Sequence, residues 1–525
     1  MNIWIASHEC SGIAEAGGVK NVTFSLCKEL YRAGHDSVLF IPVFRCTSFR
    51  EVKGMQRNVV EAKIELCGKQ ETVAYTLAFS KDWNFKIVFV EHPSFAEKEA
   101  VYTYTQNEEN KNPGHKRGCG HEDMLFLDTL FAKAVTEFGK HITENERPDI
   151  IHCQDASTAT IPLYVNNCEN LKKTKTVVTI HNAGPAYHHN FTSIDEASWY
   201  TGFDISYFTN CLNEEKPEPF LIASEYGALL TTVSPSYAEE LTDPKNDDIT
   251  DGLSSIFFEK NIPVSGITNG IDIDLYEPGN SKKSGLPFEF SPEKGDLQGK
   301  YQCRNFFLEH LKNKEQSSDD EVLYDIKKYG FLLEFENEKT VYLCYQGRLA
   351  SQKGLSVFAD ALPSILENFP NLKVIVTGQG ESALESRFAA LAENEKFKGQ
   401  MVFLNGYNRL AARLTVASSD FICLPSFFEP CGLEDFIAQV YGTLPVAHRT
   451  GGLNKIIDSK TGFLYETNKA GNLISKLSEI ISMKMYSNDR VIDLITEAAK
   501  YTRQEYNWDK VCQNAYIPLF ENLVK

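Results

Sequence analysis

Short apolar runs alternate along this chain with longer segments of helical period. In the first half, runs rich in β-branched residues are "NIWIAS", "DSVLFIPV", "KIVFVE", "DIIHCQ", "KTVVTIH" and "ALLTTVS". Segments such as "GVKNVTFSLCKELYRAG" lie between them and repeat apolar residues at helical spacing. Nearly continuous apolar strands are typical of parallel sheets that are covered by helices on both faces. The pattern therefore predicts a doubly wound α/β domain.

The same rhythm restarts in the second half of the chain. Residues 277–335 are polar and rich in Pro and Gly at first, and then helical in pattern. The new apolar runs, each followed by a helical segment, are "VYLCYQG", "KVIVTG", "MVFLNG", "DFICLP" and "LPVAH". We therefore expect two Rossmann-like α/β domains, residues 1–270 and 271–505. A closing segment, residues 506–525, has helically spaced apolar residues and should pack on another part of the protein.

Composition is that of an ordinary globular protein without a membrane helix. The 525 residues exceed what one core supports, 42% of them are hydrophobic, and the mean hydropathy is −0.30. No apolar run approaches the ~18 residues that a membrane helix needs. The start, "MNIWIASHEC", lacks the basic region and the long apolar stretch of a signal peptide. The 13 cysteines are scattered without a CxxC pair, which favours reduced thiols and a cytoplasmic location.

The charge balance excludes one class of partner. Seventy-one acidic and 53 basic residues give a formal charge of −18, which argues against general nucleic-acid binding. A small anionic ligand remains compatible with this charge, because a few cations and helix N-termini suffice to bind it. The segment "GHKRGCGHED" contains His115, Cys119 and His121, which could be read as a metal site. Their irregular spacing among Gly and Lys favours a flexible loop, and we expect no metal.

Charged residues follow two strands of the second half. In doubly wound sheets, ligands bind beyond the carboxyl ends of the strands. Arg348 and Lys353 in "GRLASQKG" are two cations that suit a diphosphate, although a solvated loop explains them as well. Glu429 in "SFFEPCGLED" precedes a predicted helix start at Cys431–Gly432, where free amides attract phosphate. An ordinary helix cap or a surface ion pair is the alternative for this acid.

The first half carries further polar or glycine-rich strand ends. Gly17 and Gly18 follow the first strand in "AEAGGVKNV" and would let the backbone approach a ligand closely. Asp155 follows "DIIHCQ" and His181 ends "KTVVTIH", while Asn269 lies in "TNGID" at the expected domain boundary. The "RTGGL" segment repeats the glycine pair in the second half, ahead of a predicted helix "LNKII". Each feature alone is more often structural, but together they gather at strand ends.

Six motifs in sequence order carry a family resemblance. They are "DIIHCQDASTA", "VVTIHN", "TTVSPSYAEEL", "GITNGID", "GRLASQKGL" and "SFFEPCGLEDFIAQVYGTLPVAHRTGGL". With them, nearly the whole chain resembles the bacterial glycogen synthase and plant starch synthase family. The resemblance implies the GT-B fold, in which two Rossmann-like domains face a deep cleft and the last helix crosses back to the first domain. It also implies transfer of glucose from ADP-glucose, with retention, to the non-reducing 4-hydroxyl of an α-1,4-glucan.

The resemblance assigns roles to individual residues. Glu429 matches the glutamate that stabilises positive charge on the sugar, and Arg348 and Lys353 match the cations that neutralise the leaving diphosphate. His181 matches a residue near the glucose 6-hydroxyl, and Asp155 matches one near the acceptor. The expected donor-binding residues are Glu15, Gly17, Gly18, Asn269, Tyr407, Cys431, Gly432, Leu433, Thr450, Gly451 and Gly452. ADP-glucose is a substrate in this scheme, so no cofactor is expected.

The implied chemistry needs charge stabilisation more than covalent catalysis. A diphosphate leaving group is stabilised by cations and by backbone amides, and the transition state resembles an oxocarbenium ion. Retention without an evident second carboxylate favours attack from the side that the phosphate leaves. The leaving phosphate would then accept the proton of the acceptor hydroxyl.

Several positions depart from the family pattern. Glu15 stands where the family's "K.GGL" motif has lysine, so an anion replaces a cation beside the expected phosphate site. Lys20, one turn further along, is a candidate to compensate. Other departures are Asn21, Ala156, Asp435 and the segment "HNAGPAYHHNF". Two alternatives stay open: a related transferase for another sugar or acceptor, and a catalytically silent glucan-binding regulatory protein.

Overall fold

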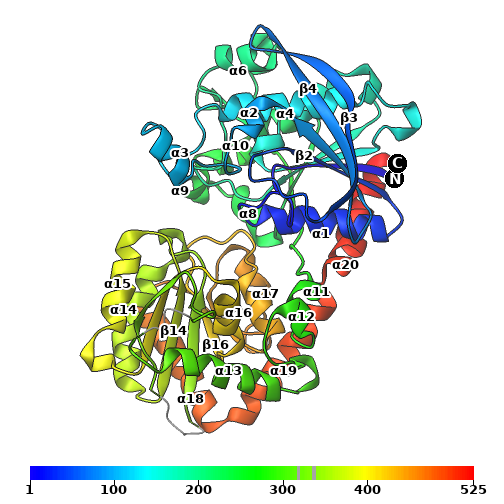
Figure 1. Ribbon diagram of the computed structural model, residues 1–525. Coiled ribbons are helices and arrows are strands. Elements are labelled where there is room, and N and C mark those ends of the chain that lie inside the picture. The colour runs from blue at the N-terminus through cyan, green and yellow to red at the C-terminus, as the bar shows by residue number, and fades with distance from the viewer. Residues whose placement is uncertain (316–319, 334–338) are drawn as a thin grey trace. The chain divides into compact units, whose positions relative to one another are not determined.

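The computed structural model divides the chain into two compact units (Figure 1). It describes residues 1–315, 320–333 and 339–525, so parts of the predicted 277–335 segment lie outside the described residues. Unit 1 comprises Met1–Asn269 and Val511–Lys525, and unit 2 comprises Gly270–Lys510. The chain thus enters unit 2 after Asn269 and re-enters unit 1 at Val511.

Unit 1 is built on one mixed sheet of nine strands, in the order β11-β10-β7-β6-β1-β2-β5-β4-β3. The six predicted strands are confirmed and pair in parallel, whereas β3 and β4 add an antiparallel hairpin at one edge. The hairpin turns at Cys67 and Gly68, whose φ values of 52° and 68° suit a two-residue turn. The strands are β1 (Asn2–Ala6), β2 (Asp36–Pro42), β3 (Val52–Leu66), β4 (Lys69–Ser80), β5 (Lys86–Glu91), β6 (Ile150–Gln154), β7 (Lys175–Ile180), β10 (Leu229–Thr232) and β11 (Val264–Gly266).

Unit 2 contains a sheet of seven strands, in the order β12-β15-β14-β13-β16-β17-β18. The five predicted strands are confirmed and run parallel, and β12 adds an antiparallel edge. The strands are β12 (Ile326–Gly330), β13 (Val341–Gln346), β14 (Leu372–Gly378), β15 (Met401–Gly406), β16 (Phe421–Leu424), β17 (Leu444–His448) and β18 (Phe463–Tyr465).

Helices cover both faces of the unit 2 sheet, as nearly continuous apolar strands require. In unit 2, one apolar cluster joins β13 and β14 to α14 and α18, and a second joins the opposite face to α13, α16 and α17. The main helices of unit 1 are α1 (Val19–Arg32), α3 (Gln106–Lys111), α4 (Met124–Phe138), α5 (Ile161–Asn166), α6 (Ile194–Thr201), α7 (Pro219–Glu225), α8 (Pro235–Leu241) and α10 (Leu253–Glu259). Those of unit 2 are α13 (Gln298–Leu311), α14 (Leu355–Asn368), α15 (Ser382–Ala392), α16 (Arg409–Ala417), α17 (Glu434–Val440), α18 (Ala470–Tyr486) and α19 (Asn488–Glu505).

The closing segment is helical but interrupted. It consists of α20 (Trp508–Val511), a π-helical turn at Cys512–Tyr516, and α21 (Ile517–Val524). The interruption precedes Pro518, which has no N–H for the regular helical bond. Tyr516 and Phe520 are buried and pack against His152 on β6, with ring centroids 5.7 and 5.5 Å apart. The last fifteen residues therefore belong to unit 1, and Tyr516 and Phe520 are part of its buried interior.

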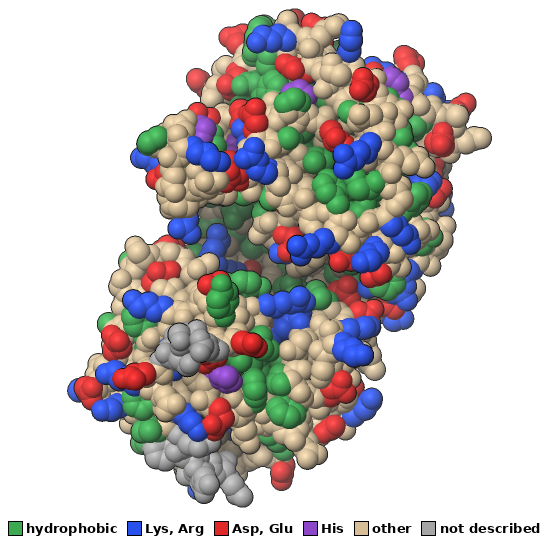
Figure 2. Space-filling view, viewed as in Figure 1, with side chains coloured by type: hydrophobic (Ala, Val, Ile, Leu, Met, Phe, Trp, Pro, Cys, Tyr) green, Lys and Arg blue, Asp and Glu red, His purple; other side chains and the backbone are tan. Residues whose placement is uncertain are grey.

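Acidic and basic side chains are interspersed over the face that Figure 2 shows. Among the residues that the structure describes, no helix is both long and apolar enough to span a bilayer.

Candidate functional site

Each sheet contains a point at which the strand order reverses. In unit 2, β14 and β15 follow β13 on one side of it in the sheet. The next strand, β16, lies on the other side of β13, and β17 continues in that direction. In unit 1, β1 and β6 are neighbours in the same way, with β2 and β7 on opposite sides. Loops diverge from the carboxyl ends of such strand pairs and leave a crevice where ligands bind. Most of the predicted site residues follow these four strands and their neighbours, whereas Tyr407 follows β15 and Asn269 follows β11.

Lys353 and Glu429 meet beyond the switch point of unit 2. The Lys353 ammonium donates to Glu429 Oε2 at 2.6 Å, and the Ser426 hydroxyl donates to the same oxygen at 3.1 Å. The two charged side chains are 25% and 13% exposed, so water screens their attraction only in part. The structure thus places a cation and a carboxylate, predicted separately from two motifs, in direct contact.

The loop that carries Arg348 and Lys353 lies directly on the end of β16. Gly354 has a φ of +65°, and a Cβ at this position would lie 1.7 Å from the carbonyl oxygen of Pro425. Only glycine allows this approach. Arg348 is exposed, and its carbonyl accepts a hydrogen bond of 2.8 Å from the Tyr345 hydroxyl. Its guanidinium is therefore available at the surface of the same loop.

The Thr450–Gly452 turn packs on the turn that carries Glu429. The Gly452 amide donates to the Glu429 carbonyl at 2.7 Å, and the Thr450 hydroxyl donates to the Phe427 carbonyl at 3.1 Å. A Cβ on Gly452 would lie 2.2 Å from the Cα of Cys431. The two glycine-containing motifs of the second half therefore form one compact surface.

Two predicted helix starts at this surface are wrong. Residues Gly451–Lys455 form a short 3₁₀ helix, η9, in place of an α-helix, because the chain turns extended at Ile456, which is buried in the core. α17 begins at Glu434 and not at Cys431–Gly432, because Gly432 adopts a φ of +79° that no right-handed helix contains.

Tyr407 lies further along the same sheet. It directly follows β15, and its ring is 64% exposed. The next residue, Asn408, caps α16 by accepting hydrogen bonds from two backbone amides. An exposed aromatic face at a strand end is suited to stacking on a planar base.

Acidic residues behind Glu429 were not singled out by the motifs, apart from Asp435. Burial raises the pKa of Glu434 to about 7, and Lys353 lowers it while Glu429 raises it. Asp435 is fully buried and forms an ion pair of 3.0 Å with Lys455. Burial raises the pKa of the Asp435 carboxyl, and Lys455 opposes that shift. The available signal was the pair of acids after "CGL" together with a lysine in "GGLNK".

The Gly17–Gly18 turn of unit 1 closes on an internal carboxylate. Glu9, only 1% exposed, accepts hydrogen bonds from the amides of Ala16 and Gly17. Burial raises the pKa of the Glu9 carboxyl, against the effect of those amides. Gly18 is the N-cap of α1. Glu9 lies three residues beyond the end of β1, in the loop where the strand-end rule places ligand contacts.

Asp155 and His181 meet beyond β6 and β7. The His181 amide donates to Asp155 Oδ1 at 3.3 Å, and His181 Nε2 donates to Gln154 Oε1 at 2.8 Å. Asp155 has φ 66° and ψ −179°, a backbone region that is normally reserved for glycine. Burial lowers the pKa of His181 to about 3 and raises that of Asp155 to about 7. The imidazole is therefore neutral at neutral pH, and strain of this kind is typical of functional sites.

Comparison with known proteins gives one consistent result. Residues 2–256 match the starch synthase catalytic domain, and residues 334–500 match the glycosyl transferases group 1. A glycogen synthase of Thermodesulfovibrio yellowstonii is 28% identical over 100% of this chain and 98% of its own. One from Flavobacterium johnsoniae is 27% identical over the whole of both chains. The catalytic domain of Arabidopsis thaliana starch synthase IV, bound to ADP and acarbose, superposes with a TM-score of 0.80 at 23% identity, covering 100% and 99% of the two chains.

The chain belongs to the glycogen and starch synthase family. Its two α/β units are therefore those of a GT-B glycosyltransferase.

The unusual Glu15 has partners in its own loop and in the first turn of α1. One carboxylate oxygen accepts from the Gly12 amide at 2.7 Å, and the other accepts from the Lys20 ammonium at 2.8 Å. Lys20 thus lies beside the acid that replaces the family lysine, and the two charges neutralise each other locally.

The other unusual segment of the synthase, "HNAGPAYHHNF", supplies two histidine–carboxylate pairs that the motifs did not predict. His189 Nδ1 lies 2.6 Å from Asp128, and His188 Nδ1 lies 3.4 Å from the fully buried Glu218. Burial acts to lower the pKa of both histidines, but the carboxylates raise it above its ordinary value. The charge of His189 also lowers the pKa of Asp155.

Asn269 is the last residue of unit 1 before the chain enters unit 2. Its amide donates to the Val233 carbonyl at 3.3 Å. Within the described ranges, its buried side-chain oxygen has no hydrogen-bond partner.

The histidines of "GHKRGCGHED" have partners other than a metal. His115 stacks on Tyr104 with centroids 4.2 Å apart, and His121 Nε2 donates to the Ala100 carbonyl at 3.0 Å. In the part of the chain that the structure describes, no three His, Cys, Asp or Glu side chains are placed to hold a metal ion.

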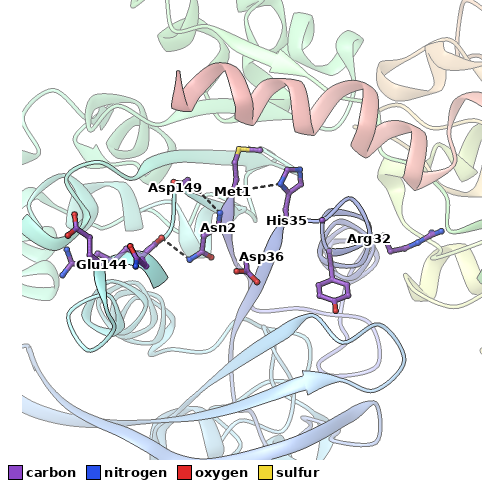
Figure 3. Close-up of a pocket in the computed structure, with 11 residues that line it drawn as sticks. Met1, Asn2, Arg32, His35, Asp36, Glu144 and Asp149 are labelled. Carbon is purple, nitrogen blue, oxygen red and sulfur yellow. Dashed lines mark hydrogen bonds between the residues drawn. The ribbon is translucent and has the colours of Figure 1, made fainter.

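A cavity of unit 1 lies at the opposite end of the strands of its sheet (Figure 3). Its volume is about 890 Å³, and Asn2 and Asp36, the first residues of β1 and β2, contribute to its wall. The Asn2 amide donates to Asp149 Oδ2 at 2.8 Å, and the amino terminus approaches His35 Nδ1 at 3.3 Å. None of the candidate residues lines this cavity, which is at the amino ends of the strands.

Proposed function

We propose that this protein transfers glucose from ADP-glucose to the non-reducing 4-hydroxyl of an α-1,4-glucan, with retention of configuration. The observation that carries the proposal is the pair of Lys353 and Glu429, 2.6 Å apart at the switch point of unit 2. A cation and a carboxylate held together there match the two charges of the reaction, a leaving diphosphate and a cationic sugar.

The donor half of the reaction uses residues of unit 2. Lys353 and Arg348 would bind the diphosphate, which takes the electron pair of the bond to the glucose C1 as that bond breaks. Glu429 would then stabilise the oxocarbenium-like sugar. The acceptor hydroxyl attacks C1 from the side of the departing phosphate, and its proton passes to a phosphate oxygen.

The acceptor half uses residues of unit 1. Neutral His181 can both donate and accept hydrogen bonds, which suits a sugar hydroxyl. Asp155 is a hydrogen-bond acceptor for the glucan, and it is held in a strained conformation by its neighbours. Asn269 and the Gly17–Gly18 turn are proposed to contribute to donor binding.

The test is incorporation of radiolabelled glucose into glycogen, with ADP-glucose and UDP-glucose as parallel donors. We expect label in polymer with ADP-glucose. Donor turnover without labelled polymer would indicate another acceptor. Binding of donor and glucan without turnover would indicate a silent regulatory protein and would overturn the proposal.

Replacement of Glu15 by lysine is expected to change donor affinity more than stability. The substitution removes the Lys20 ion pair and places two cations beside the glycine turn. We expect the KM for ADP-glucose to fall about three- to tenfold, because attraction to the diphosphate increases by about 1 kcal/mol at a partly exposed site. The melting temperature should change by no more than about 3 °C. Glu15→Gln, which only removes charge, should give an intermediate KM, and unchanged kinetics in both would show that this side chain does not face the donor.

Replacement of Asp155 by asparagine is expected to stabilise unit 1 in mild alkali while impairing transfer. The pKa of Asp155 is about 7 in the folded protein and about 4 when unfolded, so its ionisation costs stability increasingly as pH rises from 4 to 7. Asparagine removes that cost, and at about pH 8 we expect a gain of about 2 kcal/mol in the free energy of unfolding. Calorimetry at about pH 5 should give roughly one third of this gain. A variant less stable than wild type at pH 8 would contradict the assignment.

A further inference from the structure

Lys455 is a buried lysine that touches both turns of the unit 2 surface. Its side chain is 4% exposed. Its ammonium donates to the carbonyl oxygens of Cys431, Gly432 and Gly452, the last two at 3.1 and 3.2 Å. The Asp435 carboxylate lies 3.0 Å away on another side. One cation thus connects the turn after Glu429 with the glycine turn of η9.

The direction of these carbonyls fixes the direction of the neighbouring amides. In a planar trans peptide, the C=O and N–H groups point in opposite directions. Because the carbonyls of Cys431 and Gly432 point at the ammonium, the amides of Gly432 and Leu433, in the same two peptides, point away from it. Neither amide donates to an acceptor within residues 1–315, 320–333 and 339–525. Gly432 in a left-handed conformation followed by Leu433 in a right-handed one is a backbone arrangement that binds anions.

The Lys455 ammonium is charged, and its contacts are with groups of the protein itself. Burial acts to lower its pKa, but Asp435 raises it above the ordinary value, so the ammonium stays charged. The Phe436 ring lies 4.5 Å from the nitrogen and covers another side of it. Lys455 is therefore placed to hold backbone carbonyls, and Arg348 and Lys353 remain the cations that can face a ligand.

We propose that Lys455 is a positioning residue for the diphosphate of the donor. Its ammonium donates hydrogen bonds to the carbonyls of Cys431 and Gly432, and it thereby orients the amides of Gly432 and Leu433 toward the phosphate. The inference rests on the proposed function, because it assigns the ligand of those amides.

The experiment compares the affinities for ADP and for adenosine, by calorimetry, in variants of the full chain. Asp435→Leu combined with Lys455→Met removes both buried charges, and a buried ion pair replaced by apolar residues often preserves folding. We expect its Kd for ADP to rise by about tenfold or more, and its Kd for adenosine to stay within about twofold, because only ADP presents phosphates to the two amides. Lys460→Met, which removes an exposed lysine paired with Glu497, is the matched control and should leave both affinities unchanged.

Two further variants separate the effect of the hydrogen bonds from Lys455 to the carbonyls from general effects on charge or folding. Asp435→Asn keeps the ammonium and its carbonyls, and should raise the Kd for ADP by only about two- to threefold. Asp435→Asn with Lys455→Gln retains polar side chains in case the apolar pair does not fold. Its amide can serve at most two carbonyls, so the Kd for ADP should rise by at least about fivefold.

The outcomes distinguish a wrong role for Lys455 from a wrong proposed function. Wild-type affinity for ADP in a folded variant lacking Lys455 would overturn the inference alone. Equal losses of ADP and adenosine would also overturn it, because they would indicate a general collapse of the pocket. A wild-type protein that binds no nucleoside diphosphate would overturn the proposed function, and the inference with it.

Discussion

Replacement of Glu429 by glutamine is expected to lower kcat for glucosyl transfer by about 10³-fold, or about 4 kcal/mol of transition-state stabilisation. The carboxylate is 13% exposed and held by Lys353 and Ser426, so its charge acts where water screens poorly. Glutamine keeps the size and hydrogen-bonding capacity of the side chain but loses the charge that the cationic sugar requires. The expected loss is therefore mainly in kcat, while the KM for donor changes little. Steady-state incorporation of labelled glucose into glycogen measures both.

A matched control for this variant lies on the surface of the same unit. Glu367 at the end of α14 is exposed and 3.8 Å from Lys396, so Glu367→Gln should retain full activity. Transfer by Glu429→Gln at more than about one tenth of the wild-type rate would contradict the role of the carboxylate. Thermal unfolding of both variants near the wild-type temperature would exclude a folding defect.

Replacement of Lys353 by methionine is expected to lower kcat/KM for ADP-glucose by about 10²- to 10³-fold. The ammonium would neutralise charge that develops on the leaving diphosphate, and its loss also leaves the Glu429 carboxylate without its partner at 2.6 Å. Product inhibition by ADP should weaken in parallel, because ADP carries the same diphosphate. Initial rates over a range of ADP-glucose and ADP concentrations give both constants.

Replacement of Lys353 by arginine tests whether the positive charge alone is sufficient or whether the shape of the ammonium also matters. Lys353→Arg keeps the charge but replaces a compact ammonium by a planar fork, so we expect partial recovery relative to methionine. Undiminished inhibition by ADP in Lys353→Met would show that the ammonium serves Glu429 alone and does not contact the diphosphate.

The strands that organise the fold were predictable because their pattern is simple. Parallel strands such as β1 and β13 are buried on both faces, so they appear as apolar runs bounded by turns. β3 and β4 were missed because polar residues interrupt the apolar ones along this edge hairpin, which leaves no long apolar run to detect. The residue at which a helix begins was the least predictable property. The helix expected at Cys431–Gly432 begins later because Gly432 has a left-handed backbone conformation, and the sequence does not show which conformation a glycine adopts.

The site was predictable where a residue lies in the loop after a strand, and less so where its role depends on burial. Lys353 and Glu429 come from motifs 76 residues apart, and the sheet topology brings them together. Glu9 obeys the same rule but was overlooked beside the glycine pair. Lys455 and His189 were missed for a different reason: a lysine or histidine in a loop gives no sign in sequence that it is enclosed by carbonyls or a carboxylate. Such partners become visible only with the fold.

The most direct test of the central claim is the position of newly added glucose in the polymer. Glycogen extended by the wild-type protein with radiolabelled ADP-glucose should release its label as maltose on treatment with β-amylase, which cleaves α-1,4 bonds from non-reducing ends. Glu429→Gln should give no such label above background. Label that resists β-amylase would contradict retaining transfer to the non-reducing 4-hydroxyl. Label that remains attached to the protein as a glucosyl ester would contradict attack from the side of the departing phosphate, because such an ester belongs to a double displacement.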